Sequence, residues 1–316
     1  MIGTLLEKGN QILAEKHIGA RFGAETGNVV RMTREYFDSL AIETRVIDAV
    51  TASTEMILFG NKFETPVMPA ALSGLDGVCE NGLTEVAKGT HAAGSAMWAG
   101  IGDEQELASV IGTGARTIKI IKPYKDKDLI YKKILQAEKL GAMAVGMDVN
   151  FGFGGKVKDS LVRPELMAPV SLSDLQQYIT ATNLPFVIKG VLSIRDTEKA
   201  MESGAAAVVV TNHGGSIIDF AVPPLRILPL IAKHIEGRIP IFLDGGILRG
   251  SDVFKALALG AQGVLVGRTV MAGLAAGGSQ GVCDIISGMT EELRRIMSVT
   301  GSVDLNSIDP DTIWMK

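Results

Sequence analysis

The residues best suited to chemistry lie in one short segment, Thr211-Asn212-His213-Gly214-Gly215. A histidine can exchange a proton near neutral pH, so His213 is a candidate general base. The segment directly follows the apolar run 208–210, which predicts a buried strand. We therefore expect His213 to stand at a strand terminus and to act as a base. A lone histidine can also be a satisfied structural residue, and that interpretation stays open.

Ionisable side chains mark the ends of other predicted strands. Asp148 and Lys189 each end one strand, and Lys119 lies on a third. A carboxylate such as Asp148 can orient a histidine ring and stabilise its charged form, as in a catalytic triad. Lys189 ends the buried run 186–188, and a buried amine needs an acceptor. It could stabilise negative charge on a reduced cofactor, form a Schiff base, or make a structural ion pair with Asp148.

Two glycine-containing turns predict a phosphate site, namely Asp244-Gly245-Gly246 and Gly267-Arg268. Glycine lets backbone N–H groups approach a phosphate closely, and an arginine adds positive charge. In (β/α)8 barrels that hold phosphorylated ligands, the loops after the seventh and eighth strands form this cup. The alternative is that the glycines only turn the chain and that Arg268 pairs with a surface carboxylate.

A repeated pattern of helix, glycine and apolar run positions these residues. Glycine past a helix end supplies the left-handed residue that closes the helix, for example at Gly141 and Gly260. The continuous apolar run that follows is typical of a strand buried on both faces. The expected strands are residues 67–71, 95–98, 117–121, 143–147, 186–188, 207–210, 239–243 and 264–266.

About eight such units predict an α/β fold, a (β/α)8 TIM barrel with an N-terminal helical extension. An open doubly wound sheet is the alternative. We expect a single domain over residues 1–316. Its expected parts are the helical extension at 1–60, the barrel at 61–280, and a C-terminal helix and tail at 281–316. Helices are expected at 126–140 and 285–297.

Composition narrows the functional class. The net charge of −4 is mild, which argues against a broad basic face for nucleic acid. Cys79 and Cys283 form neither a metal-ligand spacing nor a disulfide framework, which favours a reducing compartment. Charged residues interrupt the first apolar stretch, and no apolar run reaches the ~20 residues of a membrane-spanning helix. We expect a cytoplasmic enzyme that acts on a small molecule, without a metal, a membrane or a nucleic-acid partner.

The motifs closely resemble the FMN-dependent α-hydroxy acid oxidase and dehydrogenase family. The resemblance is strongest over residues 184–308, through residues 188–190, 211–215, 242–246 and the long run 250–268. It implies a TIM barrel that binds FMN, and a homo-oligomer that is commonly a tetramer.

The resemblance also implies individual roles. Lys189 would stabilise the anionic reduced flavin, Asp244 would hold the ribityl chain, and Arg268 would hold the phosphate. His213 would take a proton while the flavin N5 accepts the substrate's hydride, with Asp148 in support. The expected catalytic residues are His213, Lys189 and Asp148. The expected cofactor-binding residues are Pro69, Ala70, Ala71, Lys119, Lys189, Thr211, His213, Asp244, Gly245, Gly246, Gly267 and Arg268.

The substrate side departs from the family pattern. An arginine normally follows the glycine pair after the histidine and clamps the substrate carboxylate, but this chain has Ser216 there. A glutamine and a tyrosine expected on the third strand are aligned with Lys119 and Ile121. We therefore expect a substrate other than an ordinary small 2-hydroxy acid, with Lys119 or Lys122 as a substitute cation.

Other interpretations remain open at this stage. The lysine-rich run 122–133 otherwise predicts a solvated helix face. A flavin-dependent isomerase without net redox and a non-catalytic barrel that binds flavin or phosphate are the alternative functions.

Overall fold

The computed structural model describes residues 2–18 and 23–315. Within these residues, eight parallel strands form one sheet in the order β4-β13-β12-β11-β10-β7-β6-β5. Their bounds are β4 Val67–Pro69, β5 Met97–Ala99, β6 Thr117–Ile121, β7 Ala144–Asp148, β10 Phe186–Val191, β11 Ala207–Thr211, β12 Ile241–Asp244 and β13 Gly263–Val266.

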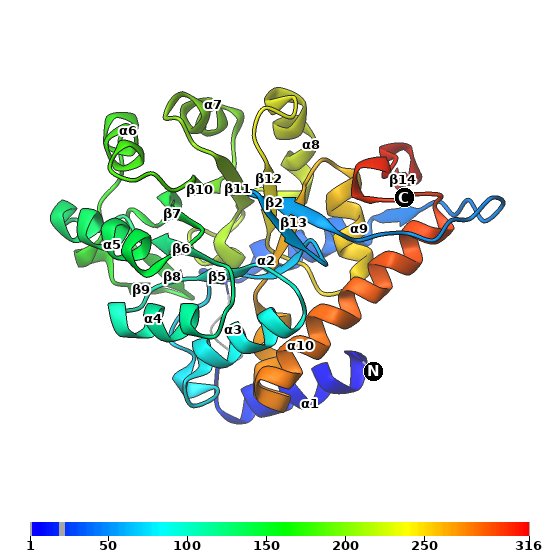
Figure 1. The fold of residues 1–316 in the computed structure, drawn as a ribbon, viewed down its shortest axis with the longest axis horizontal. Coiled ribbons are helices and arrows are strands. Elements are labelled where there is room, and N and C mark those ends of the chain that lie inside the picture. Colours follow the sequence, from blue (N-terminus) through cyan, green and yellow to red (C-terminus); the bar gives the residue numbers. More distant parts are fainter. Residues whose placement is uncertain (1, 19–22, 316) are drawn as a thin grey trace.

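A helix follows each of these strands, and together the helices surround the sheet (Figure 1). They are α3 Gly82–Ala92, α4 Glu104–Gly112, α5 Lys127–Leu140, α6 Leu172–Thr180, α7 Ile194–Glu202, α8 Pro224–Ile235, α9 Gly250–Ala258 and α10 Arg268–Val299. Local sequence sets their ends. The Asp126 carboxylate accepts a hydrogen bond from the Leu129 N–H at 3.2 Å to begin α5, and Gly141 at φ +86° ends it.

The sheet closes on itself between β4 and β5. Leu72 pairs with Ala99 in parallel, and the Gly100 N–H donates to the Leu72 carbonyl at 3.1 Å. The (β/α)8 barrel prediction is therefore confirmed, and the open sheet is excluded. Large side chains fill the interior, where Trp98 and Phe242 meet edge to face with ring centroids 5.5 Å apart.

The predicted N-terminal helical extension is confirmed as α1 Ile2–Glu15 and α2 Asn28–Asp38. Helix α1 packs along α10, as Figure 1 shows. The helix predicted at 285–297 is the later part of α10, which is broken by non-helical backbone at Gly277 and Gly278.

Short antiparallel ribbons complete the described chain. The hairpin of β2 Met56–Leu58 and β3 Asn61–Phe63 packs against the barrel interior, and β1 Leu40–Ile42 pairs with β14 Ile313–Met315. A third ribbon, β8 Gly155–Val157 with β9 Ser160–Val162, follows β7. Among the helices of residues 2–18 and 23–315, none is long and apolar enough to cross a membrane.

Candidate active site

The pleat of the strands decides which side chains reach the mouth of the barrel. Side chains two residues apart lie on the same face of a strand. A side chain that points into the barrel therefore places the side chain two residues later on the same face, nearer the mouth. Val187, Val209 and Phe242 are buried in the interior cluster. Two residues further on, the same face presents Lys189, Thr211 and Asp244 at the carboxyl ends of β10, β11 and β12.

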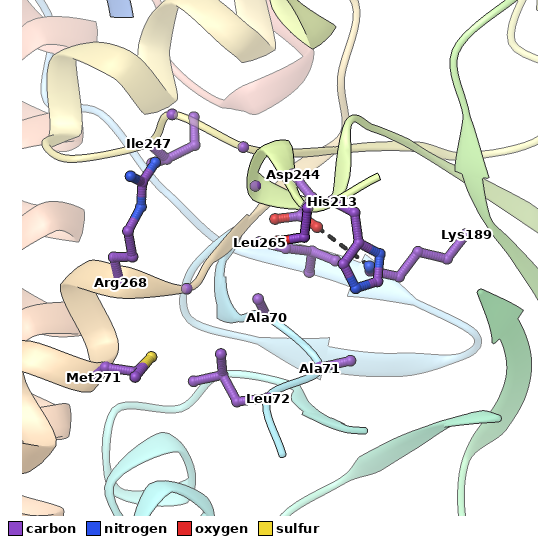
Figure 2. A pocket seen from close by; sticks show the side chains of 15 residues that line it. Ala70, Ala71, Leu72, Lys189, His213, Asp244, Ile247, Leu265, Arg268 and Met271 are labelled. Atoms are coloured by element: carbon purple, nitrogen blue, oxygen red, sulfur yellow. Dashed lines mark ion pairs between the residues drawn. The ribbon is translucent and has the colours of Figure 1, made fainter. Parts of the chain in front are cut away.

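A pocket opens at this mouth, with a volume of about 770 Å³ that includes space open to solvent. Figure 2 shows His213 and Asp244 near Lys189 on one side, with Arg268 and Ile247 on another. The lining residues are Ala70, Ala71, Leu72, Lys189, His213, Gly214, Ser216, Asp244, Gly245, Gly246, Ile247, Leu265, Gly267, Arg268 and Met271.

Asp148 is the centre of a buried charge cluster. Its two carboxylate oxygens accept from the Lys122 amine at 2.6 Å and the Lys189 amine at 2.8 Å. Lys189 also lies 3.3 Å from an Asp244 oxygen. Burial by itself raises the pKa of Asp148, but the two ammonium groups lower it overall, so the carboxylate is ionised. The ion pair of Lys189 with Asp148, one of the alternatives from the sequence, is present.

His213 occupies a strained backbone position beside this cluster. Its φ is +55°, a left-handed conformation that is uncommon outside glycine. The Thr211 hydroxyl holds the turn by accepting from the His213 N–H at 2.9 Å. Burial, followed by the charges of Lys189 and Lys122, lowers the pKa of His213 well below its ordinary value of 6.5. The imidazole is therefore neutral at neutral pH and able to take a proton.

His213 and Asp148, which were expected to act together as in a catalytic triad, lie close to each other without a hydrogen bond. The His213 Nδ1 lies 3.7 Å from the Asp148 Oδ1, beyond hydrogen-bond distance, and has no hydrogen-bond partner among the described residues. Asp148 is occupied by the two lysines instead. Its support for the histidine is electrostatic, through a negative charge that partly offsets Lys122 and Lys189.

The glycine turns form a cradle that suits a phosphate. Gly245 and Gly246 have φ of +113° and +86°, and a Cβ on Gly246 would come within 2.7 Å of the Thr33 side chain. Gly267 directly precedes α10, whose N-terminus begins with Arg268. Backbone N–H groups at a helix N-terminus and a guanidinium both favour a bound phosphate. In Figure 2 the Arg268 side chain extends toward Ile247 on the loop after β12.

Helix α2 of the extension braces this cradle. The Arg34 guanidinium bonds both carboxylate oxygens of Asp252, at 2.8 and 2.9 Å, and also donates to the Gly246 carbonyl at 3.0 Å. Asp252 in turn accepts from the Leu248 N–H at 2.9 Å. At the start of the helix, Asp219 accepts from the Val29 N–H at 2.7 Å. The extension therefore fixes the loop that follows β12.

The expectation that Lys119 belongs to the mouth is wrong. On β6 the interior side chains are Ile118 and Ile120, so Lys119 faces the helices. Its amine donates to the Gly100 carbonyl there and does not line the pocket. The next interior position is Lys122. The prediction of a solvated face is wrong for this lysine, because its side chain is only 8% exposed.

The remaining predicted residues differ in how directly they reach the pocket. Ala70, Ala71, Gly245, Gly246, Gly267 and Arg268 line it. Pro69 ends β4 and Thr211 ends β11 just below, and neither is a lining residue. Thr211 contributes indirectly, since its hydroxyl donates to Asp244 at 3.0 Å.

Four lining residues were not predicted from the sequence, namely Leu72, Ile247, Leu265 and Met271. Ile247 follows the predicted Gly245-Gly246 turn, and Met271 lies one helical turn beyond Arg268. The spacing of Ile247 and Met271 from residues already predicted could therefore have identified both as pocket residues.

The barrel and its mouth define a class of protein, a (β/α)8 barrel with a phosphate cradle beside a neutral histidine. Comparison with known proteins is consistent with that class. The sequence model described as FMN-dependent dehydrogenase matches residues 19–162 and 152–315. Glycolate oxidase 5 of Oryza sativa subsp. japonica is 31% identical over 325 residues, covering 90% of this chain and 87% of that protein. Glycolate oxidase of Spinacia oleracea has the same identity and coverage.

Solved structures of similar fold lead to the same class of protein. A mandelate oxidase superposes with a TM-score of 0.91 at 25% identity, covering 100% of this chain and 98% of that one. Mandelate oxidase with (S)-2-phenylpropionate gives the same TM-score and coverage at 26% identity. The chain belongs to the FMN-dependent dehydrogenase family. It is an FMN-dependent oxidoreductase that acts on CH–OH groups, and its cradle fits the cofactor's phosphate.

Proposed function

We propose that this enzyme oxidises a hydroxy acid other than glycolate or lactate, with His213 as the base. The observation that carries the proposal is the His213 imidazole at the wall of a pocket that also contains a phosphate cradle, with the Asp148 carboxylate 3.7 Å from its Nδ1. Relatives named for glycolate and mandelate oxidation support a hydroxy acid as the substrate class. Ser216 supports an altered substrate, because a serine cannot bind a carboxylate as an arginine does.

In this mechanism His213 removes the proton of the substrate hydroxyl. A neutral histidine is required, and burial together with Lys189 and Lys122 keeps it neutral. The imidazolium formed by proton transfer is stabilised by the Asp148 carboxylate 3.7 Å away. The cradle of Gly246, Gly267 and Arg268 would hold FMN, which would supply the acceptor for the hydride that leaves the substrate carbon. Lys189 is positively charged, since Asp148 and Asp244 together raise its pKa in spite of burial.

The test is anaerobic reduction of the FMN-loaded protein by a panel of 2-hydroxy acids of increasing size. We expect loss of the flavin's visible absorbance with at least one member of the panel, and slower loss with glycolate and lactate. Rapid reduction by glycolate or lactate would contradict the altered substrate. Conversion of a substrate with no electron acceptor and no net reduction would instead indicate an isomerase.

We also propose that the enzyme is a homo-oligomer, commonly a tetramer in the family it resembles. Exposed apolar side chains at the β1–β14 ribbon and the adjoining loop support this proposal, namely Val46, Ile47, Trp314 and Met315. Light scattering after size-exclusion chromatography tests it, and a monomer would contradict it. A cytoplasmic location stays a prediction from the sequence.

A further inference from the structure

Lys122 occupies a position that the known parts of the site do not explain. It follows β6, its side chain is nearly buried, and it is not among the residues that line the pocket. Its amine donates to the Asp148 Oδ2 at 2.6 Å and lies 3.9 Å from the centre of the Phe151 ring. The same amine is 3.4 Å from the His213 Nε2. The lysine therefore contacts the candidate base directly.

That contact favours one tautomer of the imidazole. Paired with the Asp148 carboxylate at 2.6 Å, the Lys122 amine is an ammonium that only donates, so the contact fits a ring whose Nε2 accepts and whose Nδ1 carries the proton. The Nε2 lone pair is the only basic site of a neutral ring. With Lys122 in this place, the lone pair that would take the substrate proton already accepts a hydrogen bond from the lysine and is covered by it.

The two lysines of the cluster differ in how firmly they are held. Lys189 is paired with two carboxylates, Asp148 and Asp244. Lys122 has one carboxylate partner, and its contact with the histidine is long. A lysine amine on a flexible stem can exchange a weak neutral acceptor for an anion at small cost. Lys122 is therefore the cation of the cluster that an incoming anion would attract.

We propose that Lys122 binds the anionic group of the substrate and thereby uncovers the Nε2 of His213. This inference rests on the proposed hydroxy-acid oxidation, and it identifies the substrate as one with an anionic group next to the reacting CH–OH. Lys122 then serves in place of the arginine that Ser216 lacks. A neutral hydroxy compound is a poor substrate, because it cannot draw the lysine away from the base.

The first test measures binding without turnover. Oxalate is a small dianion that resembles a hydroxy acid but has no C–H bond to oxidise, and its binding to the FMN-loaded protein is measured by calorimetry. Lys122→Met should raise the Kd for oxalate at least tenfold, and Lys122→Gln should act in the same direction. Lys125→Met is the matched control, because Lys125 is exposed on the same loop and should leave binding unchanged.

The second test compares charged and neutral substrates. Lys122→Met should lower kcat/KM for the best hydroxy acid at least tenfold, and it should raise kcat/KM for the corresponding amide, because the variant leaves the Nε2 of His213 uncovered. Adding Ser216→Arg to Lys122→Met should recover much of the oxalate affinity, since an arginine at 216 supplies a cation from another wall.

The pH profile gives an independent readout. The charged groups that face His213 are Lys122 after β6, Asp148 on β7 and Lys189 on β10. Without Lys122, Asp148 loses one partner and a positive charge leaves the ring. The acid limb of kcat/KM should therefore move to higher pH in Lys122→Met.

The outcomes separate the two proposals. A wild-type protein that no hydroxy acid reduces would refute the proposed function. A protein that is reduced normally, but whose Lys122→Met and Lys122→Gln variants keep the wild-type oxalate Kd and the wild-type preference for acid over amide, would refute only the role of Lys122.

Discussion

At the scale of single residues, the electrostatics of the site depend on which groups bind the Asp148 carboxylate. The carboxylate binds Lys122 and Lys189, so the imidazole of His213 faces two ammonium groups without a hydrogen-bonded carboxylate of its own. Positive neighbours and burial both disfavour the imidazolium. A base that must accept a proton benefits from this arrangement, because it is already unprotonated at neutral pH.

The low pKa of His213 predicts an activity that survives mild acid. Since the pKa lies well below 6.5, the neutral form persists as the pH falls through 6.5. The acid limb of a kcat/KM profile, which reports groups of the free enzyme, should have its midpoint below that value. A midpoint at or above 6.5 would show that the environment of His213 is misassigned.

Lys119 predicts a pH-dependent stability that is separate from catalysis. Burial lowers its pKa from 10.5 to about 8, so the unfolded chain holds a proton between these values that the folded chain lacks. The free energy of unfolding should therefore rise as the pH increases across this window. Below pH 8 the buried, charged Lys119 lowers this free energy by about 3 kcal/mol, at 1.36 kcal/mol per pKa unit. Urea unfolding between pH 7.5 and about 10 should show a smaller slope in Lys119→Met. Parallel curves for the two proteins would contradict this account.

At the scale of elements, α2 joins the N-terminal extension to the cofactor loop. Arg34→Met removes the bonds to Asp252 and to the Gly246 carbonyl, so the loop after β12 should loosen. We expect the Kd for FMN to rise about tenfold, equivalent to about 1.4 kcal/mol, in a fluorescence titration. Arg31→Met on the same helix is the control, because Arg31 is exposed and bonds Asn28 and Glu35 of its own helix. Equal affinities in the two variants would mean that α2 does not brace the loop.

The strands themselves were largely predictable from the sequence. The apolar run 117–121 coincides with β6, and residues 186–188 begin β10, because buried parallel strands are apolar on both faces. For the same reason the sequence did not reveal which face of β6 points inward. Ile118, Ile120 and Ile121 are equally apolar, although only the first two line the barrel. Lys119 was therefore placed at the mouth in error.

Contacts between distant segments were not predictable at all. The Asp219 carboxylate caps α2 across 190 residues of sequence, and Lys122 reaches His213 across 91. No local spacing reports such a meeting, since it depends on how the closed barrel brings loops together. The glycine turns were predictable because their chemistry is local. Glycine itself readily adopts a positive φ, as Gly245 and Gly246 do.

At the scale of the whole molecule, the barrel provides a rigid frame whose loops meet at one cofactor. The loops after β4, β11, β12 and β13 all contribute lining residues. A ligand that binds only the folded state stabilises it, by about 2.7 kcal/mol when its concentration is 100 times its Kd. FMN at that excess should raise the melting temperature measured by calorimetry. An unchanged melting temperature would show that the cofactor does not bind this mouth.

The central claim is that His213 takes the substrate proton in an FMN-dependent oxidation. Its most direct test is anaerobic reduction of FMN-loaded His213→Asn by the best hydroxy acid, followed in a stopped-flow spectrometer. We expect FMN to remain bound and the reduction rate to fall by about 10²–10⁴-fold, the usual contribution of a general base. Reduction of the variant at the wild-type rate would contradict the account.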